Sequence, residues 1–176
     1  MIPLVRSEAF PQHPAGGRRL RGGVADRPGR DDPRPGGYDA SSTPRPSWPP
    51  RSLAGLTVLI VDDDSGSLDY FGTALRAAGA VVLTASTAPE ALRLVQERRP
   101  DVVLSDIAMP GRDGYWLVSE IRRLSSPIGE VPVVATTAYG RLHPRERALA
   151  AGFVDHLPKP VEPDVLCMAI ASAAGR

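Results

Sequence analysis

The sequence predicts an α/β fold in which a five-stranded parallel sheet is covered on both faces by helices. Five short apolar segments alternate with five segments whose apolar residues recur every three or four positions. The first pattern is typical of strands buried on both faces, and the second is typical of helices that pack through one face. Parallel neighbours need a helical crossover, so the alternation favours a parallel sheet flanked by helices.

Composition divides the chain near residue 55. Residues 1–55 contain ten prolines, eight glycines and nine arginines against five acidic residues, with few apolar runs. Such a segment buries too little apolar surface to offset the entropy lost on ordering, which predicts a disordered Pro/Gly/Arg-rich tail. Residues 56–176 are long enough for one domain with its own core.

Several classes of protein are disfavoured by the sequence. A single cysteine, Cys167, excludes an internal disulfide, and no apolar run approaches the roughly 20 residues that span a membrane. The N-terminus lacks the apolar stretch of an export signal, so a cytoplasmic location without membrane contact is expected. No glycine-rich loop follows a strand, which disfavours a dinucleotide site. No DNA-binding domain is expected after Arg176.

The first two strand–helix units are the most regular. Residues 56–61 and 80–84 are predicted strands. The helix between them places four apolar residues on one face: Leu68, Phe71, Leu75 and Ala78. The next helix begins at Thr87, which with Glu90 forms a capping box, and it ends before Pro100.

The remaining three units are recognised by the same alternation. Their strands are expected over residues 101–106, 131–136 and 153–157, and their helices over about 115–124, 144–151 and 162–173. The last helix is expected to bury Val165, Leu166 and Ile170.

Reactive side chains follow four of the five predicted strands. Asp62 and Asp63 end the first strand, Asp106 the third, Thr137 the fourth, and Lys159 follows the fifth. In open parallel sheets, ligands bind at the carboxyl ends of the strands. We therefore expect these groups to converge on one edge of the sheet.

The three aspartates predict a divalent cation site. At about 4 Å and an effective dielectric near 20, each pair of carboxylates repels by about 4 kcal/mol. A cation relieves this repulsion, and oxygen ligands suit Mg²⁺ or Mn²⁺. The alternative is that the acidic run 62–64 only caps the following helix, and this is the favoured interpretation for Asp64.

Lys159 is the only lysine among 21 basic residues. The chain otherwise uses arginine, so a compact ammonium at a strand end suggests a partner for a phosphoryl oxygen. The bond before Pro160 is a candidate cis peptide. The hydroxyl of Thr137 could bind the same phosphoryl group, although threonine also simply favours strands.

Four fragments in this order resemble the receiver domain of bacterial response regulators. They are Val61-Asp62-Asp63, Ser105 to Pro110 with Asp113-Gly114, Thr137-Ala138, and Lys159-Pro160. The resemblance implies a flavodoxin-like fold with strand order 2-1-3-4-5. It implies the following roles: Asp106 as phosphoacceptor, Asp62, Asp63 and the Ala108 carbonyl as further metal ligands, Thr137 as switch hydroxyl, and Lys159 as phosphoryl partner.

The chain departs from the family at His156, where relatives commonly carry Tyr or Phe. In relatives this ring turns inward when the threonine moves, so His156 is a candidate switch residue that protonation could bias. The alternative is an ordinary, partly exposed histidine. Ala108 and Tyr139 occupy loop positions that modulate phosphoaspartate hydrolysis in the family.

The leading hypothesis is a phosphoacceptor signalling module rather than an enzyme acting on a separate substrate. A sensor histidine kinase or a phosphotransfer protein would phosphorylate Asp106, and an unidentified output protein or a phosphorylation-dependent dimer would respond. Two alternatives remain open. A phosphatase of the haloacid dehalogenase type would use acids two apart on the first strand, as in the run 62–64, and a scaffold would never be phosphorylated.

Overall fold

The computed structural model describes residues 52–138 and 142–176. The predicted disordered tail, apart from its last four residues, and Tyr139 lie outside these ranges. Within them, every helix is too short or too polar to traverse a lipid bilayer.

A parallel sheet of five strands forms the centre of the domain. Its strands are β1 (Thr57–Val61), β2 (Val81–Ala85), β3 (Val102–Asp106), β4 (Val133–Thr137) and β5 (Asp155–Pro158). The order is β2-β1-β3-β4-β5, with every neighbouring pair parallel. This order confirms the predicted flavodoxin-like topology, with the reversal between β1 and β3.

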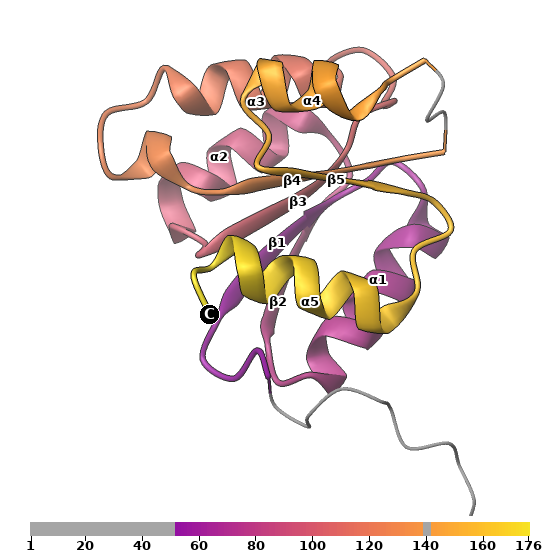
Figure 1. Ribbon diagram of the computed structural model, residues 1–176. Helices are drawn as coiled ribbons and strands as arrows, with labels where there is room; N and C mark the ends of the chain where they lie inside the picture. Colours follow the sequence, from indigo (N-terminus) through magenta and orange to yellow (C-terminus); the bar gives the residue numbers. More distant parts are fainter. Residues whose placement is uncertain (1–51, 139–141) are drawn as a thin grey trace, which may run out of the picture. The chain divides into compact units, whose positions relative to one another are not determined.

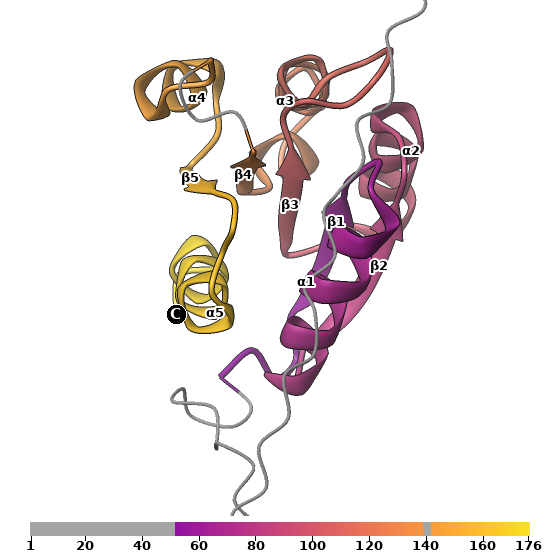
Figure 2. The same ribbon diagram turned by 90° about the vertical axis from the view of Figure 1, so that its right-hand side faces the viewer.

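Helices cover both faces of the sheet (Figure 1). They are α1 (Ser65–Ala77), α2 (Ala88–Arg98), α3 (Gly114–Arg122), α4 (Arg145–Ala151) and α5 (Pro163–Ala173), with a 3₁₀ turn η1 (Ile128–Glu130). In Figure 1, α1 and α5 lie on one side of the sheet, and α2, α3 and α4 lie on the other; Figure 2 shows the same layers from the side. Alternate strand residues fill the two cores between these layers.

Local capping explains where the helices begin. The Asp64 carboxylate accepts a hydrogen bond from the Ser67 N–H at 2.7 Å, as predicted for a helix cap. Thr87 accepts from the Glu90 N–H at 3.4 Å, and the Glu90 carboxylate reaches back to the Ser86 N–H at 3.0 Å. The predicted capping box at the start of α2 is therefore present, with the return bond displaced by one residue.

The packed structure extends beyond the boundary expected at residue 56. Leu53 is fully buried in the core that α1 and α5 share, and its N–H donates to the Ala78 carbonyl at 3.0 Å. The burial of one leucine was not recognisable in a segment dominated by proline and glycine. At the other end, Val165 is 44% exposed, so the prediction that α5 buries it is wrong.

Candidate functional site

The carboxyl ends of four strands meet at one edge of the sheet, as predicted. Asp62 directly follows β1, Asp106 ends β3, Thr137 ends β4, and Lys159 directly follows β5. Backbone bonds fix their relative positions: the Thr137 carbonyl accepts from the Lys159 N–H at 2.9 Å, and the Thr136 carbonyl accepts from the Ile107 N–H at 2.9 Å.

Lys159 joins two of the aspartates. Its Nζ lies 2.6 Å from Asp62 Oδ2 and 3.1 Å from Asp106 Oδ1. The peptide bond from Lys159 to Pro160 is cis, as the sequence suggested. Two residues of α1 contact the ammonium: Nζ lies 5.9 Å from the Phe71 ring centre and donates to the Ser67 hydroxyl at 3.4 Å. The ammonium is therefore held against the acids from both β5 and α1.

Asp62, Asp63 and Asp106 form an acidic cluster whose carboxylate oxygens lie within 4.8 Å of one another. Asp62 and Asp106 are buried, whereas Asp63 is exposed. Three carboxylates and one ammonium leave the cluster with a formal charge of −2. The buried Asp106 Oδ1, although ion-paired with Lys159, accepts no hydrogen bond from any described residue. A hard divalent cation fits this set of donors.

Opposing effects act on the Asp106 carboxyl. Burial raises its pKa above the ordinary value, and the charge of Asp62 adds to this, while Lys159 and the Ala108 N–H favour the carboxylate. The Ala108 N–H donates to Asp106 Oδ2 at 3.0 Å. The carboxylate is thus poorly solvated and is directed toward the cluster.

The Lys159 ammonium is stabilised by its partners. Burial alone would lower its pKa, but the hydrogen bond from the ammonium to Asp62 and the charges of Asp106 and Asp62 prevail and raise it. Lys159 is therefore a cation throughout the neutral range.

The loop after β3 depends on Gly114, which lies against the strand end. A Cβ at this position would lie 2.5 Å from the Asp106 carbonyl oxygen and 2.9 Å from Ile107 Cα. The Gly114 N–H donates to the Ile107 carbonyl at 2.9 Å, and Asp113 caps the following helix through the Trp116 N–H at 2.8 Å. Asp113-Gly114 therefore closes the loop that carries Ala108.

Two side chains at the site had no signal in the sequence. Ser67 contacts Lys159, and Phe71 lies beneath its ammonium. Serine in the first turn of a helix is ordinary, and the spacing of Phe71 predicts only a core position, so neither residue has a distinguishing pattern. Only the fold brings α1 and the end of β5 together.

His156 lies apart from the acidic cluster. It is 8% exposed, so the alternative of a partly exposed histidine is wrong. Its neighbour Leu157 packs in the core with α1 and α5, which directs His156 to the opposite face of the sheet. Among the described contacts, the His156 ring has no hydrogen bond or ion pair with the acids or with Lys159. It therefore lies on the face of the sheet that α4 covers rather than at the acids.

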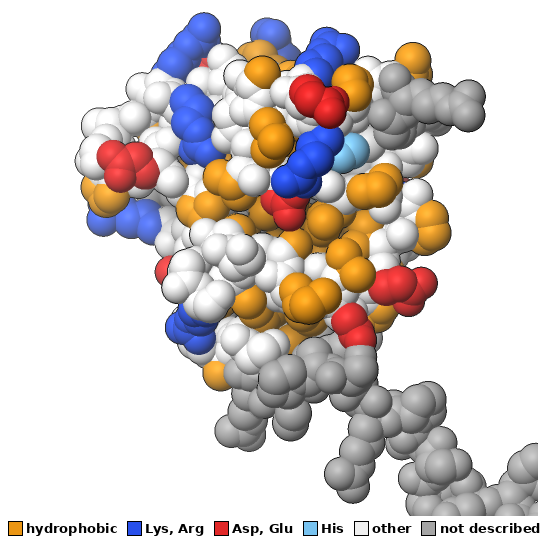
Figure 3. Space-filling model, viewed as in Figure 1, with side chains coloured by type: hydrophobic (Ala, Val, Ile, Leu, Met, Phe, Trp, Pro, Cys, Tyr) orange, Lys and Arg blue, Asp and Glu red, His pale blue; other side chains and the backbone are white. Residues whose placement is uncertain are grey.

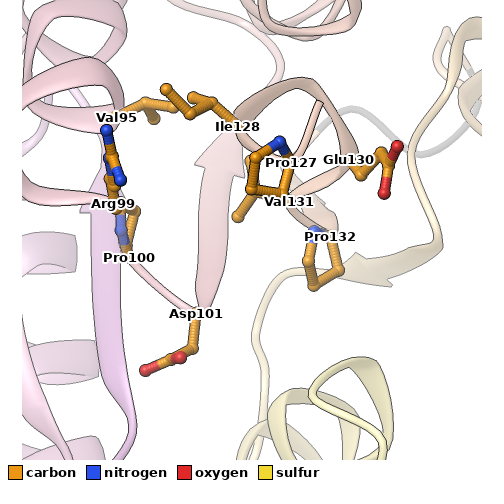
Figure 4. A pocket seen from close by; sticks show the side chains of 9 residues that line it. All are labelled: Val95, Arg99, Pro100, Asp101, Pro127, Ile128, Glu130, Val131 and Pro132. Carbon is orange, nitrogen blue, oxygen red and sulfur yellow. The ribbon is translucent and has the colours of Figure 1, made fainter. Parts of the chain in front are cut away.

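A pocket of about 310 Å³ lies at the other edge of the sheet (Figure 4). Its lining includes Pro100 and Asp101 before β3, and Val131 and Pro132 before β4. These residues precede the strands, whereas the acidic cluster follows them. The pocket is therefore separate from the candidate site.

Comparison with known protein families assigns the chain to a family. The model of the response regulator receiver domain matches residues 58–171. The chain belongs to the response regulator receiver domain family. The domain is thus one of the receiver domains of two-component signalling, and the acidic cluster lies within the matched residues.

Curated relatives support this assignment. An uncharacterised 14.6 kDa protein of Leptolyngbya boryana is 43% identical over 114 residues, covering 64% of this chain and 86% of that protein. The transcriptional regulatory protein PrrA of Mycobacterium tuberculosis is 41% identical over 103 residues, covering 58% of this chain and 43% of PrrA. The chain spans less than half the length of the transcriptional regulators that it matches.

Solved structures agree with the fold. A putative response regulator from Chloroflexus aurantiacus has a TM-score of 0.64 and 34% identity, covering 69% of this chain and 98% of its own. The receiver domain of a Pseudomonas aeruginosa sensor histidine kinase has a TM-score of 0.64 and 31% identity, covering 70% and 100%. That structure contains a magnesium ion coordinated in the active site cleft.

Proposed function

We propose that Asp106 receives a phosphoryl group from a phosphohistidine of a sensor histidine kinase or phosphotransfer protein. The observation that carries the proposal is the position of Lys159 Nζ, 3.1 Å from Asp106 Oδ1 and 2.6 Å from Asp62 Oδ2. A buried carboxylate, two more acids and one ammonium together supply a nucleophile, a cation site and a charge that can follow a phosphoryl oxygen.

In the transfer, an Asp106 carboxylate oxygen attacks phosphorus as the phosphorus–nitrogen bond to the donor imidazole breaks. The electron pair leaves with the imidazole nitrogen, and an acyl phosphate forms on Asp106. The Ala108 N–H holds Oδ2 at 3.0 Å, which leaves Oδ1 beside the ammonium. Lys159 then pairs with an oxygen of the transferred group.

Asp62, Asp63 and Asp106 would hold Mg²⁺ or Mn²⁺, and the Ala108 carbonyl is proposed as a further ligand from the family resemblance. When bound, the cation supplies positive charge that offsets the developing charge on the phosphoryl oxygens. The magnesium-containing receiver structure from P. aeruginosa supports this choice of metal.

Phosphorylation would then alter the surface formed by α4, β5 and α5. Thr137 is proposed as the switch hydroxyl; it ends β4, and its carbonyl binds the Lys159 N–H. Figure 3 shows apolar side chains gathered on the face that carries α4, β5 and α5. Val154, 47% exposed, directly precedes β5, and Met168, 61% exposed, lies on α5. This surface is available to an output protein or a second copy of the chain. The cytoplasmic location expected from the sequence stays a prediction.

The phosphatase alternative is less well supported. It requires two acids two residues apart after the first strand to act together, which would pair Asp62 with Asp64. The Asp64 carboxylate instead caps α1 through the Ser67 N–H. We therefore propose that the chain accepts a phosphoryl group and does not turn over a separate phosphate ester.

The test is phosphorylation by acetyl phosphate with Mg²⁺, followed by intact-mass and peptide mass spectrometry. The wild type is expected to gain one phosphoryl group on the peptide that contains Asp106, and Asp106→Asn is expected to gain none. Asp64→Asn is the matched control, because asparagine also caps helices and Asp64 lies outside the cluster. Equal labelling of wild type and Asp106→Asn would refute the proposal.

A further inference from the structure

His156 occupies an unusual position for a titratable side chain. It is 8% exposed in the middle of β5 and lies beside Ala135 of β4 in the sheet register. The face of the sheet to which it points also carries the small buried side chains Ala135 and Ala148, the latter from α4. An imidazole ring is therefore enclosed between the sheet and α4.

The ring has an unsatisfied nitrogen. His156 Nε2 is buried and has no hydrogen-bond partner among the described residues. Two further buried polar atoms on this side of the sheet also have no hydrogen-bond partner among the described residues: the Tyr115 hydroxyl and His143 Nδ1. The centres of the Tyr115 and His143 rings lie 5.6 Å apart. In a neutral imidazole one nitrogen is an acceptor, whereas in an imidazolium both nitrogens must donate. In the protonated ring, Nε2 must therefore donate, and no described acceptor lies within its reach.

The surrounding charges do not compensate that proton. Arg145 of α4 and His143 before α4 disfavour it, and Asp155 of β5 is the described acid that favours it. Asp155 Oδ1 is already occupied: it pairs with the Arg145 guanidinium and accepts from the His156 N–H at 2.8 Å. Burial is the larger effect, and together these influences lower the pKa of His156 below its ordinary value.

We propose that His156 is an acid-sensitive switch whose protonation loosens the packing of α4 against β5. The neutral ring is compatible with the enclosed position, and the charged ring needs an acceptor at Nε2 that the described residues do not supply. Acidification therefore favours a state in which the ring leaves the interior and the Arg145–Asp155 pair between α4 and β5 rearranges. This switch operates whether or not Asp106 accepts a phosphoryl group.

The direction of the pH effect follows from the lowered pKa. The unfolded chain binds this proton more readily than the folded chain, so the contribution of His156 to stability is intact above about pH 6.5. It is lost as the pH falls through the folded-state pKa. Because other groups also titrate, the difference between wild type and a variant without His156 isolates the effect.

The test combines two measurements on the full chain between about pH 8 and about pH 5. Nuclear magnetic resonance of the histidine ring protons should show His156 titrating below the ordinary histidine value. Amide hydrogen exchange, corrected for its intrinsic pH dependence, should show a loss of protection in α4 on acidification. His156→Phe should abolish that loss, because phenylalanine fills the space and binds no proton, whereas His13→Asn should behave as wild type.

Two results would overturn the proposal. One is a His156 ring whose pKa lies at or above the ordinary histidine value, with no change in the amide hydrogen exchange of α4. The other is a His156→Phe protein whose α4 loses protection as the wild type does. If His156→Phe does not fold, the ring titration and α4 exchange of the wild type decide the question without it.

Discussion

Two residues beside Asp106, Lys159 and Gly114, determine the geometry of the site. Lys159 is the only lysine in the chain, and its ammonium lies against two of three clustered carboxylates. Gly114 has no side chain, and this allows the start of α3 to lie against the Asp106 carbonyl. The first residue supplies charge to the site, and the second allows the loop that carries Ala108 to close.

Gly114→Ala should destabilise the domain by about 1–3 kcal/mol and slow phosphorylation of Asp106, because the new Cβ meets rigid backbone atoms. Those atoms are the Asp106 carbonyl oxygen at 2.5 Å and Ile107 Cα at 2.9 Å. Urea unfolding measures the first effect, and the rate of acetyl phosphate labelling measures the second.

Gly72→Ala is the matched control for that substitution. Its Cβ would meet the end of a flexible side chain, Arg76 Nη1 at 2.9 Å, in the interior of α1. Alanine favours a helix over glycine by about 1 kcal/mol, so this variant should be as stable as wild type or more so. Similar unfolding free energies for the two alanine variants would contradict the close approach at Gly114.

At the scale of elements, Arg122 joins α3 to two other segments. Its guanidinium donates to the Gly129 and Val131 carbonyls, each at 2.8 Å, and to the Gly152 carbonyl at 2.8 Å. Burial lowers the pKa of this guanidinium. One guanidinium therefore binds carbonyls in η1, in the residue after η1 and at the end of α4. It has no carboxylate partner among the described residues.

Arg122→Met should lower the free energy of unfolding by about 3 kcal/mol, because it removes charged donors from three carbonyls. Chemical denaturation compares it with Arg123→Met. Arg123 is 72% exposed in its side chain and, among the described residues, pairs with Glu120, so its loss should cost less than about 1 kcal/mol. Equal costs for the two variants would show that the carbonyl contacts of Arg122 do not stabilise the fold.

The elements were largely predictable from sequence because their patterns are local. Each strand begins and ends within about two residues of its predicted range, and the caps at Asp64 and Thr87 were recognised by residue type alone. Arg122 was not recognised, since an arginine near the end of a helix resembles any exposed one. Its role requires carbonyls that are seven to thirty positions away in sequence.

The candidate site was predictable for a different reason. Parallel topology brings the carboxyl ends of strands to one edge, so the sequence pattern is enough to place Asp62, Asp106 and Lys159 together. The contacts of Ser67 and Phe71 with Lys159 depend on how α1 packs against the end of β5, and sequence patterns do not specify that packing. The enclosure of His156 likewise depends on the small residues opposite it.

At the scale of the domain, the last two strands connect two regions of the molecule. The acidic cluster lies at the carboxyl edge, and the apolar surface of α4, β5 and α5 lies beside the last strand. β4 and β5 connect them, because Thr137 and Lys159 end or follow these strands and are bonded through their backbones at 2.9 Å. A change at Asp106 therefore has a short covalent and hydrogen-bonded route to that surface.

The central claim, that Asp62, Asp63 and Asp106 form one cation site at the phosphoacceptor, is tested most directly by the Mg²⁺-induced shift in melting temperature. Binding at a hundredfold excess over Kd stabilises a fold by about 2.7 kcal/mol. The wild type and Asp69→Asn, whose side chain is exposed on α1 outside the cluster, should show the same upward shift. Asp62→Asn and Asp106→Asn should show little or none. A wild type that Mg²⁺ does not stabilise, or equal shifts in all four proteins, would contradict the claim.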